Sequence, residues 1–217
     1  KPDLVWIKSR ASGDHGWYDS IRGVTKRLKS NSTDAESDVP IGSFDNNGFS
    51  FATEMYYNSN STNYVAWCWK AGGAAVSNSD GTITSQVSAN QEAGFSIVTY
   101  TGTNGNGTFG HGLGKAPKWV IIRRRDSGSS WVIYHESIGN TKRLDFTAYG
   151  SATSSGWWNN TSPTSTTFSV GTDAGHNGST DGYVAWCWTD VPGFSKFGSY
   201  VGNGDGNGQY VYLGFRP

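Results

Sequence analysis

The chain has 217 residues, and its 17 basic and 17 acidic side chains give a formal net charge of zero. A general binder of nucleic acid or of anionic membrane surfaces carries a basic excess, so neither partner is expected. No stretch approaches the roughly 18 apolar residues of a membrane-spanning helix, so membrane insertion is not expected either.

Short runs of β-branched and aromatic residues, bounded by Gly, Asn, Asp and Ser, occur along the chain and are typical of strands. In chain order the clearest runs are residues 4–10, 64–69, 95–100, 119–125 and 209–215. No window shows convincing helical periodicity. Regular short strands separated by turn signals favour an all-β fold of antiparallel β-sandwich type, either jelly-roll or lectin-like.

The hexapeptide YVAWCW occurs twice, at residues 64–69 and 183–188. Other shared stretches follow the same order, including TKRL at residues 25–28 and 141–144. A structural element is needed once in each domain, so we interpret the chain as a duplication. The sequence predicts two tandem sandwiches.

The stretch GFS at residues 94–96 recurs at residues 193–195, closer to the hexapeptide than in the first copy. The difference arises from residues 70–94, a Gly-, Ala- and Ser-rich stretch typical of an inserted segment. We therefore place the first β-sandwich repeat at residues 1–114 and the second at residues 115–217. The chain starts at KP and ends at RP, the same point of the unit, which suggests an array that continues in both directions and stacks head to tail.

Alternation along YVAWCW places Tyr, Ala and Cys on one face and Val and both Trp on the other. Both faces are largely apolar, which favours a central strand for each copy. Cys68 and Cys187 occupy the same position in the two copies. We expect buried free thiols rather than a disulfide between the copies. The tryptophans expected in the core are Trp6, Trp67, Trp69, Trp119, Trp186 and Trp188.

Catalytic or metal-binding groups are hard to find in this sequence. A glycoside hydrolase needs two carboxylates aimed at one bond. None of the four glutamates (Glu36, Glu54, Glu92 and Glu136) is paired with a second carboxylate along an evident strand. The histidines lack the spacing of metal ligands. We therefore predict no enzyme, no catalytic residue and no cofactor. Asp205, in GNGDGNGQ, is a weak candidate for calcium, although a simple turn is the favoured interpretation.

Two adjacent tryptophans, Trp157 and Trp158, lie in the polar stretch SSGWWNNTSPTST, next to Asn159 and Asn160. Sugar-binding sites combine an aromatic face with amide groups, so these four residues form a candidate carbohydrate site. The alternative is a loop whose tryptophans fold back over the sandwich. The sequence leaves both interpretations open.

The order of these stretches resembles a tandem repeat of virion proteins of tailed bacteriophages, of the tail-fibre or appendage type. The resemblance covers nearly the whole chain and is carried by GFSIVTYTGTNGNGTFGHGLGKAPKWVIIRRR, WWNNTSPTSTTFSVG and GYVAWCWTDVPGFSKFGSYVGNGDGNGQYVYLGFRP. It implies concanavalin-like sandwiches with no established chemistry. It adds no catalytic or ligand residues.

We therefore expect a structural and adhesive virion module, in a tail fibre, an appendage or a capsid decoration. Loops on a rigid β framework suit such a module. Its partners would be other virion subunits or copies of itself, and host-surface glycans are a further candidate. Its location would be the virion surface. The alternative function is that of a carbohydrate-binding lectin, and a glycoside hydrolase is a third.

Overall fold

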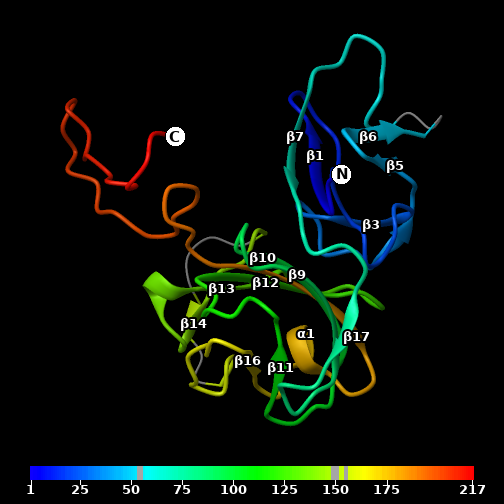
Figure 1. Cartoon of the computed structure of the whole chain (residues 1–217). Coiled ribbons are helices and arrows are strands. Elements are labelled where there is room, and N and C mark those ends of the chain that lie inside the picture. The colour runs from blue at the N-terminus through cyan, green and yellow to red at the C-terminus, as the bar shows by residue number, and fades with distance from the viewer. Residues whose placement is uncertain (53–55, 148–151, 154–155) are drawn as a thin grey trace.

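The structure is a computed structural model of the chain and describes residues 1–52, 56–147, 152–153 and 156–217. The described secondary structure is almost entirely β, and its sheets are built from antiparallel strand pairs (Figure 1). The expected all-β class is therefore confirmed. Among the described residues, no helix has the length and hydropathy needed to cross a membrane.

The first sheet has five strands and is built from the N-terminal third of the chain (Figure 1). In spatial order they are β4 (Ser37–Asp38), β3 (Lys26–Lys29), β2 (His15–Asp19), β1 (Leu4–Ser9) and β7 (Tyr64–Trp69). In this sheet β1 lies between β2 and β7, with Trp6 opposite both Trp17 and Trp67. The first copy of the hexapeptide, β7, therefore forms one end of the sheet.

The second sheet has six strands. In spatial order they are β13 (Val132–His135), β12 (Trp119–Arg124), β17 (Gly182–Trp188), β10 (Phe95–Thr101), β9 (Ser85–Asn90) and β8 (Val76–Asn78). The second copy of the hexapeptide, in β17, lies between β12 and β10. Strand β10, which the repeat places in the unit 1–114, thus pairs with β17 of the unit 115–217, and β9 and β8 extend the same sheet. The division into two domains at residue 114 remains a prediction.

Smaller elements complete the fold. They are the pairs β5 (Gly42–Asp45) with β6 (Gly48–Phe51), β11 (Gly107–Gly110) with β16 (Thr167–Val170), and β14 (Lys142–Arg143) with β15 (Ala152–Thr153), the 3₁₀ turn Glu136–Ile138 and the helix α1 (Ala174–Asn177). Asp173 caps α1 by accepting a hydrogen bond from the backbone N–H of Gly175.

The two large sheets share one aromatic core. Because side chains alternate along a strand, each sheet directs one row toward the other sheet and the next row away from it. Trp17 of the first sheet lies 5.1 Å from Trp186 and 5.4 Å from Trp131, measured between ring centroids. Leu4, Leu28, Ile97 and Ile121 belong to the same cluster. This shared tryptophan core joins the two halves of the chain.

Each sheet buries its other face under a smaller element. Val5, Ile7 and Tyr18 pack with Phe44 of β5, while Val120 and Ala185 pack with Phe109 of β11 and Phe168 of β16. The result is a layered, sandwich-like arrangement, with the tryptophan core in the middle and one smaller core outside each sheet.

The two copies of the hexapeptide differ in their surroundings. In β17 the alternation is as expected, since Tyr183, Ala185 and Cys187 face the outer core and Trp186 faces the tryptophan core. The prediction of a central strand is confirmed for this copy. It is wrong for β7, which pairs only with β1 among the described residues. Trp67 is consequently 41% exposed, and the expectation that it lies in the core is wrong as well.

The two cysteines also differ between the central strand β17 and the edge strand β7. Both are free, as expected. Cys187 is buried and burial raises its pKa to about 12, whereas Cys68 is exposed because no strand covers it. The prediction of a buried thiol is therefore confirmed for Cys187 and wrong for Cys68.

The C-terminal segment, defined here as residues 193–217, contains no strand. The predicted strand at residues 209–215 is therefore wrong for the chain as it stands. The segment leaves the second sheet after β17 and extends outward (Figure 1). Its position leaves several apolar side chains in solvent.

Candidate functional site

The loop with the paired tryptophans places Trp158 inside the outer core of the second sheet. The side chain is fully buried. Its ring contacts Phe168 at 5.1 Å, and its indole N–H donates to the carbonyl oxygen of Lys142 at 2.8 Å. A fully buried ring cannot stack on a sugar from solvent, so the carbohydrate assignment is wrong for Trp158. The alternative, a tryptophan that folds back over the sheet, describes this residue.

Trp157 is half-buried, and its ring is already in contact with other groups. The guanidinium of Arg143 lies 4.2 Å from the ring centroid, within cation–π range, and the ring of His176 lies 5.3 Å away. Asn159 and Asn160 are exposed and adopt left-handed backbone conformations, with φ of 49° and 48°. The structure thus brings two amides to the surface without the exposed pair of rings that the sugar site required.

His176 of α1 is fully buried between these tryptophans. Its Nε2 accepts a hydrogen bond from the backbone N–H of Gly171 at 3.1 Å, which fits a neutral ring. Burial lowers the pKa of His176 to about 4, against an ordinary value near 6.5. At a pH between these two pKa values, His176 binds a proton in the unfolded chain but not in the folded chain.

We expect His176 to make the protein less stable as the pH falls. Its contribution is complete above pH 6.5 and falls between pH 6.5 and 4, reaching a loss of about 3 kcal/mol below the lower pKa. Urea unfolding at pH 7, 5.5 and 4 measures this loss. His176→Gln should flatten the dependence, while the control His15→Gln should flatten it much less, because His15 is partly exposed although its pKa is lowered in the same direction by burial. Equal slopes for His176→Gln and the unaltered protein would contradict this assignment.

A cluster of four charged side chains joins the two sheets. Arg22 donates to the carboxylate of Asp19 at 2.6 Å and to that of Glu36 at 2.8 Å. Arg125, next to β12, donates to both oxygens of Glu36, at 2.9 and 3.1 Å. The indole N–H of Trp186 donates to Asp19 at 3.2 Å, so the cluster is continuous with the tryptophan core.

This ion-pair cluster brings two carboxylates together, which the sequence did not reveal. Its members come from residues 19, 22, 36 and 125 and meet only in the folded chain. Burial alone would raise the pKa of Glu36, but hydrogen bonds and charge from Arg125 and Arg22 outweigh it and lower the pKa. Both carboxylates are paired with arginine, and the side chain of Asp19 is fully buried while that of Glu36 is 10% exposed. Such a cluster stabilises the fold, and Glu36 lacks the raised pKa of a general acid.

The weak calcium candidate lies in the C-terminal segment. Asp205 is exposed, and its carboxylate accepts a hydrogen bond from the backbone N–H of Asn207 at 2.9 Å, while Asn203 accepts one from the N–H of Asp205. These bonds describe a polar turn. Within the described ranges, no group of three or more acidic, histidine or cysteine side chains is placed to hold a metal ion. Glu54 lies outside the described residues.

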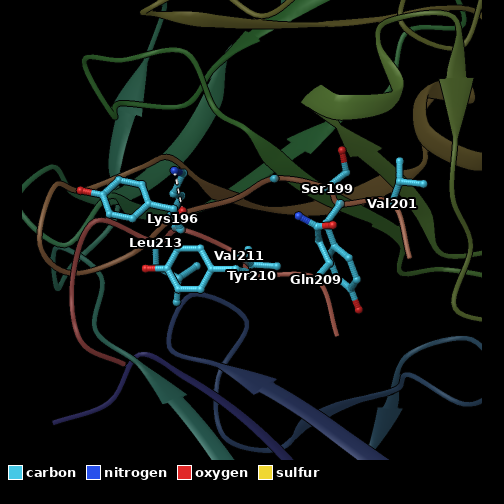
Figure 2. A pocket seen from close by; sticks show the side chains of 10 residues that line it. Lys196, Ser199, Val201, Gln209, Tyr210, Val211 and Leu213 are labelled. Carbon is cyan, nitrogen blue, oxygen red and sulfur yellow. Dashed lines mark hydrogen bonds between the residues drawn. The ribbon is translucent and has the colours of Figure 1, made fainter. Parts of the chain in front are cut away.

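A groove lies within the C-terminal segment (Figure 2). It has a volume of about 570 Å³ and lies between residues 196–201 and residues 209–213. The ammonium group of Lys196 donates to the carbonyl oxygen of Tyr212 at 2.9 Å and lies 5.3 Å from its ring centroid. Tyr200 and Tyr210 are mostly exposed. The groove therefore offers aromatic surface beside a positive charge and the amide of Gln209.

One family model matches the chain, over residues 1–217, and its description is a domain of unknown function (DUF7483). No curated protein and no solved structure matched the chain.

Proposed function

The chain belongs to the DUF7483 family, and we propose that it is a structural and adhesive module of a virion, in a tail fibre, an appendage or a capsid decoration. Its proposed location is the virion surface. Its proposed partners are other virion subunits, copies of itself and surfaces of the host cell. The role is one of assembly and contact, without a catalytic step.

The observation that carries this proposal is the exposed apolar surface of the C-terminal segment. Phe194, Tyr200, Val201, Tyr210 and Tyr212 are each at least 65% exposed, although they follow a well-packed sheet. A soluble protein seldom exposes neighbouring large apolar side chains unless a partner covers them. The layered sheets supply a rigid support for this surface, and a near-zero net charge adds no electrostatic preference for nucleic acid.

Immunogold electron microscopy tests the virion assignment. An antibody raised against the purified chain should label a defined part of particles purified from an infected culture, and pre-immune serum should not. Label on the tail would assign the module to a fibre or appendage, and label on the head would assign it to a decoration. A protein that is found in the lysate but is neither labelled on the particles nor detected in them by mass spectrometry would overturn the proposal.

Carbohydrate binding is the second candidate, and the groove of Figure 2 favours it. Exposed tyrosines beside an amide and an ammonium group offer stacking surface and hydrogen-bond donors. A glycan array with the unaltered chain, Tyr210→Ala and Asn159→Ala locates such a site. Binding lost only in Tyr210→Ala would support adhesion through the groove, and binding lost only in Asn159→Ala would return the site to the loop after Trp158. No saturable binding by the folded chain would leave assembly as the proposed role.

A further inference from the structure

The outer edge of β7 is without a strand partner among the described residues. Its counterpart, the hexapeptide in β17, lies between β12 and β10. The repeat aligns DLVWIKSR at residues 3–10 with KWVIIRRR at residues 118–125, and so matches Trp6 with Ile121. Trp67 lies opposite Trp6 and Trp186 lies opposite Ile121, so β7 pairs with β1 in the same register as β17 with β12. The difference is confined to the other side, where β10 covers β17 and no described strand covers β7. An unpaired strand edge is a template for strand addition.

The sequence that covers this edge in the second sheet is repeated in the C-terminal segment. Strand β10 begins within GFS at residues 94–96 and ends within YTGTNGNG at residues 100–107. Residues 193–208 contain GFS and then YVGNGDGNG in the same order. The first copy is buried as a strand. The second copy forms no strand, and its Phe194 is 65% exposed. Among the described residues, β7 thus has an unpaired edge, and residues 193–208 repeat the sequence that covers the same edge of β17 without forming a strand.

A second unpaired edge, on β6, fits the same segment. In the outer layer of the second half, β11 pairs with β16 and places Phe109 opposite Phe168. The repeat matches FS at residues 49–50 with FS at residues 168–169, and therefore β6 with β16. It matches NG at residues 106–107 with NG at residues 207–208, and therefore β11 with residues 208–211. Among the described residues, β6 pairs only with β5. The same alignment places Tyr210, which is 80% exposed, opposite Phe49.

We propose that residues 193–217 of a second copy of this chain complete the first sheet, with residues 194–200 pairing antiparallel to β7 and residues 208–211 pairing with β6. The contact buries the apolar side chains of the C-terminal segment on the half-exposed face of β7. It joins the segment of one copy to the edge of the next, so the copies associate head to tail. The proposal concerns contacts between copies and goes beyond the virion role, because it holds wherever the protein is located.

The position of the segment points to a second copy as its acceptor. Two backbone hydrogen bonds between Val191 and Ser195, at 2.9 and 3.1 Å, close a tight turn at the start of the segment, just after β17. Phe197 then donates its N–H to Asp190 at 2.8 Å and contacts Trp119 at 5.9 Å. Beyond these contacts the segment runs outward, clear of β7 (Figure 1). Pairing exchanges the contact of Phe197 with Trp119 for contacts with β7 of the neighbouring copy.

The register of this contact can be tested with the native thiol of Cys68. Ser96 lies opposite Cys187 in the pairing of β10 with β17, so the repeat places Ser195 opposite Cys68. Opposite residues of antiparallel strands have Cα atoms about 4.5–5.5 Å apart, within the range that a disulfide spans. Cys187 does not interfere, because it is buried and its pKa is raised to about 12.

The experiment mixes two forms of the chain under mild oxidation. The acceptor is the unaltered chain, and the donor carries Cys68→Ser and Ser195→Cys together with a tag that makes mixed dimers recognisable on a non-reducing gel. The matched control donor carries Cys68→Ser and Ser79→Cys, since Ser79 is an exposed loop serine away from the segment. We expect mixed dimers to form at least about tenfold faster with Ser195→Cys, because strand pairing raises the effective concentration of the two thiols.

Two results would overturn the proposal. The first is mixed-dimer formation no faster than with the Ser79→Cys control. The second comes from a chain that carries both Cys68 and Ser195→Cys: if it forms only a disulfide within one chain at every concentration, the segment closes on its own edge. The immunogold experiment is independent of both, since virion location and pairing between copies can fail separately.

Discussion

We expect Trp186→Ala to lower the free energy of unfolding by about 4 kcal/mol, within the range for removal of a fully buried large aromatic side chain. Trp186 is completely buried and its ring contacts both Trp17 and Trp131. Its removal leaves a cavity between the sheets and also removes the hydrogen bond to the carboxylate of Asp19. Urea unfolding followed by tryptophan fluorescence measures the loss.

The matched control is Trp67→Ala, at the same position of the other hexapeptide. Trp67 is 41% exposed on a strand with an open edge, so we expect a loss of about 1 kcal/mol. Trp186→Phe keeps part of the ring contact and should fall between the two, which retains a measurable variant if Trp186→Ala does not fold. Similar losses for Trp67→Ala and Trp186→Ala would contradict the assignment of edge and central positions.

The second large effect is expected at the ion-pair cluster. Glu36→Gln should lower the free energy of unfolding by about 3 kcal/mol at pH 7, because removal of one partner leaves buried charge without compensation. Arg22 is fully buried and keeps only Asp19 as a carboxylate partner in this variant. The control is Glu136→Gln, whose carboxylate pairs with Lys118 and is half-exposed. We expect that control to cost less than about 1 kcal/mol.

The same variant has a defined dependence on pH. The pKa of Glu36 is lower in the folded chain than in the unfolded chain, so the folded state binds fewer protons in the acid range. Its contribution is therefore present above its ordinary pKa of about 4.3 and is lost as the pH falls through the lowered value. Unfolding at pH 7 and pH 3 should show the difference between Glu36→Gln and the unaltered chain shrinking in acid. A difference that stays constant would show that Glu36 acts by packing alone.

The sequence identified the all-β class because strand formation depends on local pattern, whereas the division at residue 114 stays a prediction. The alternation in YVAWCW correctly assigned the faces of β17, since the side-chain period of two is a property of the strand itself. Whether such a strand is central or at an edge depends on a neighbour from a distant part of the chain. The prediction of a central strand from the hexapeptide was therefore correct for β17 and wrong for β7.

The positions of the candidate site residues likewise depend on contacts between distant parts of the chain, which the local sequence does not reveal. Trp158 lies in a polar stretch that left both exposure and packing open. The structure decides between them, because its indole N–H donates to the carbonyl oxygen of Lys142 and its ring packs against Phe168. Glu36 shows no partner within its own stretch of sequence, because Arg125 reaches it only when the two sheets pack together. The repeat of GFS carried a further signal, since it indicated which sequence covers the edge of a hexapeptide strand.

Amide hydrogen exchange of the two hexapeptides tests most directly the claim that they differ only in having one covered and one open edge. Their identical sequences give them nearly the same intrinsic exchange chemistry, so a difference in rate reports the structure around each strand. We predict that residues 183–188 are protected at every protein concentration. Residues 64–69 should exchange faster in dilute solution and become protected as the concentration rises. Equal protection of both strands in dilute solution would contradict the account.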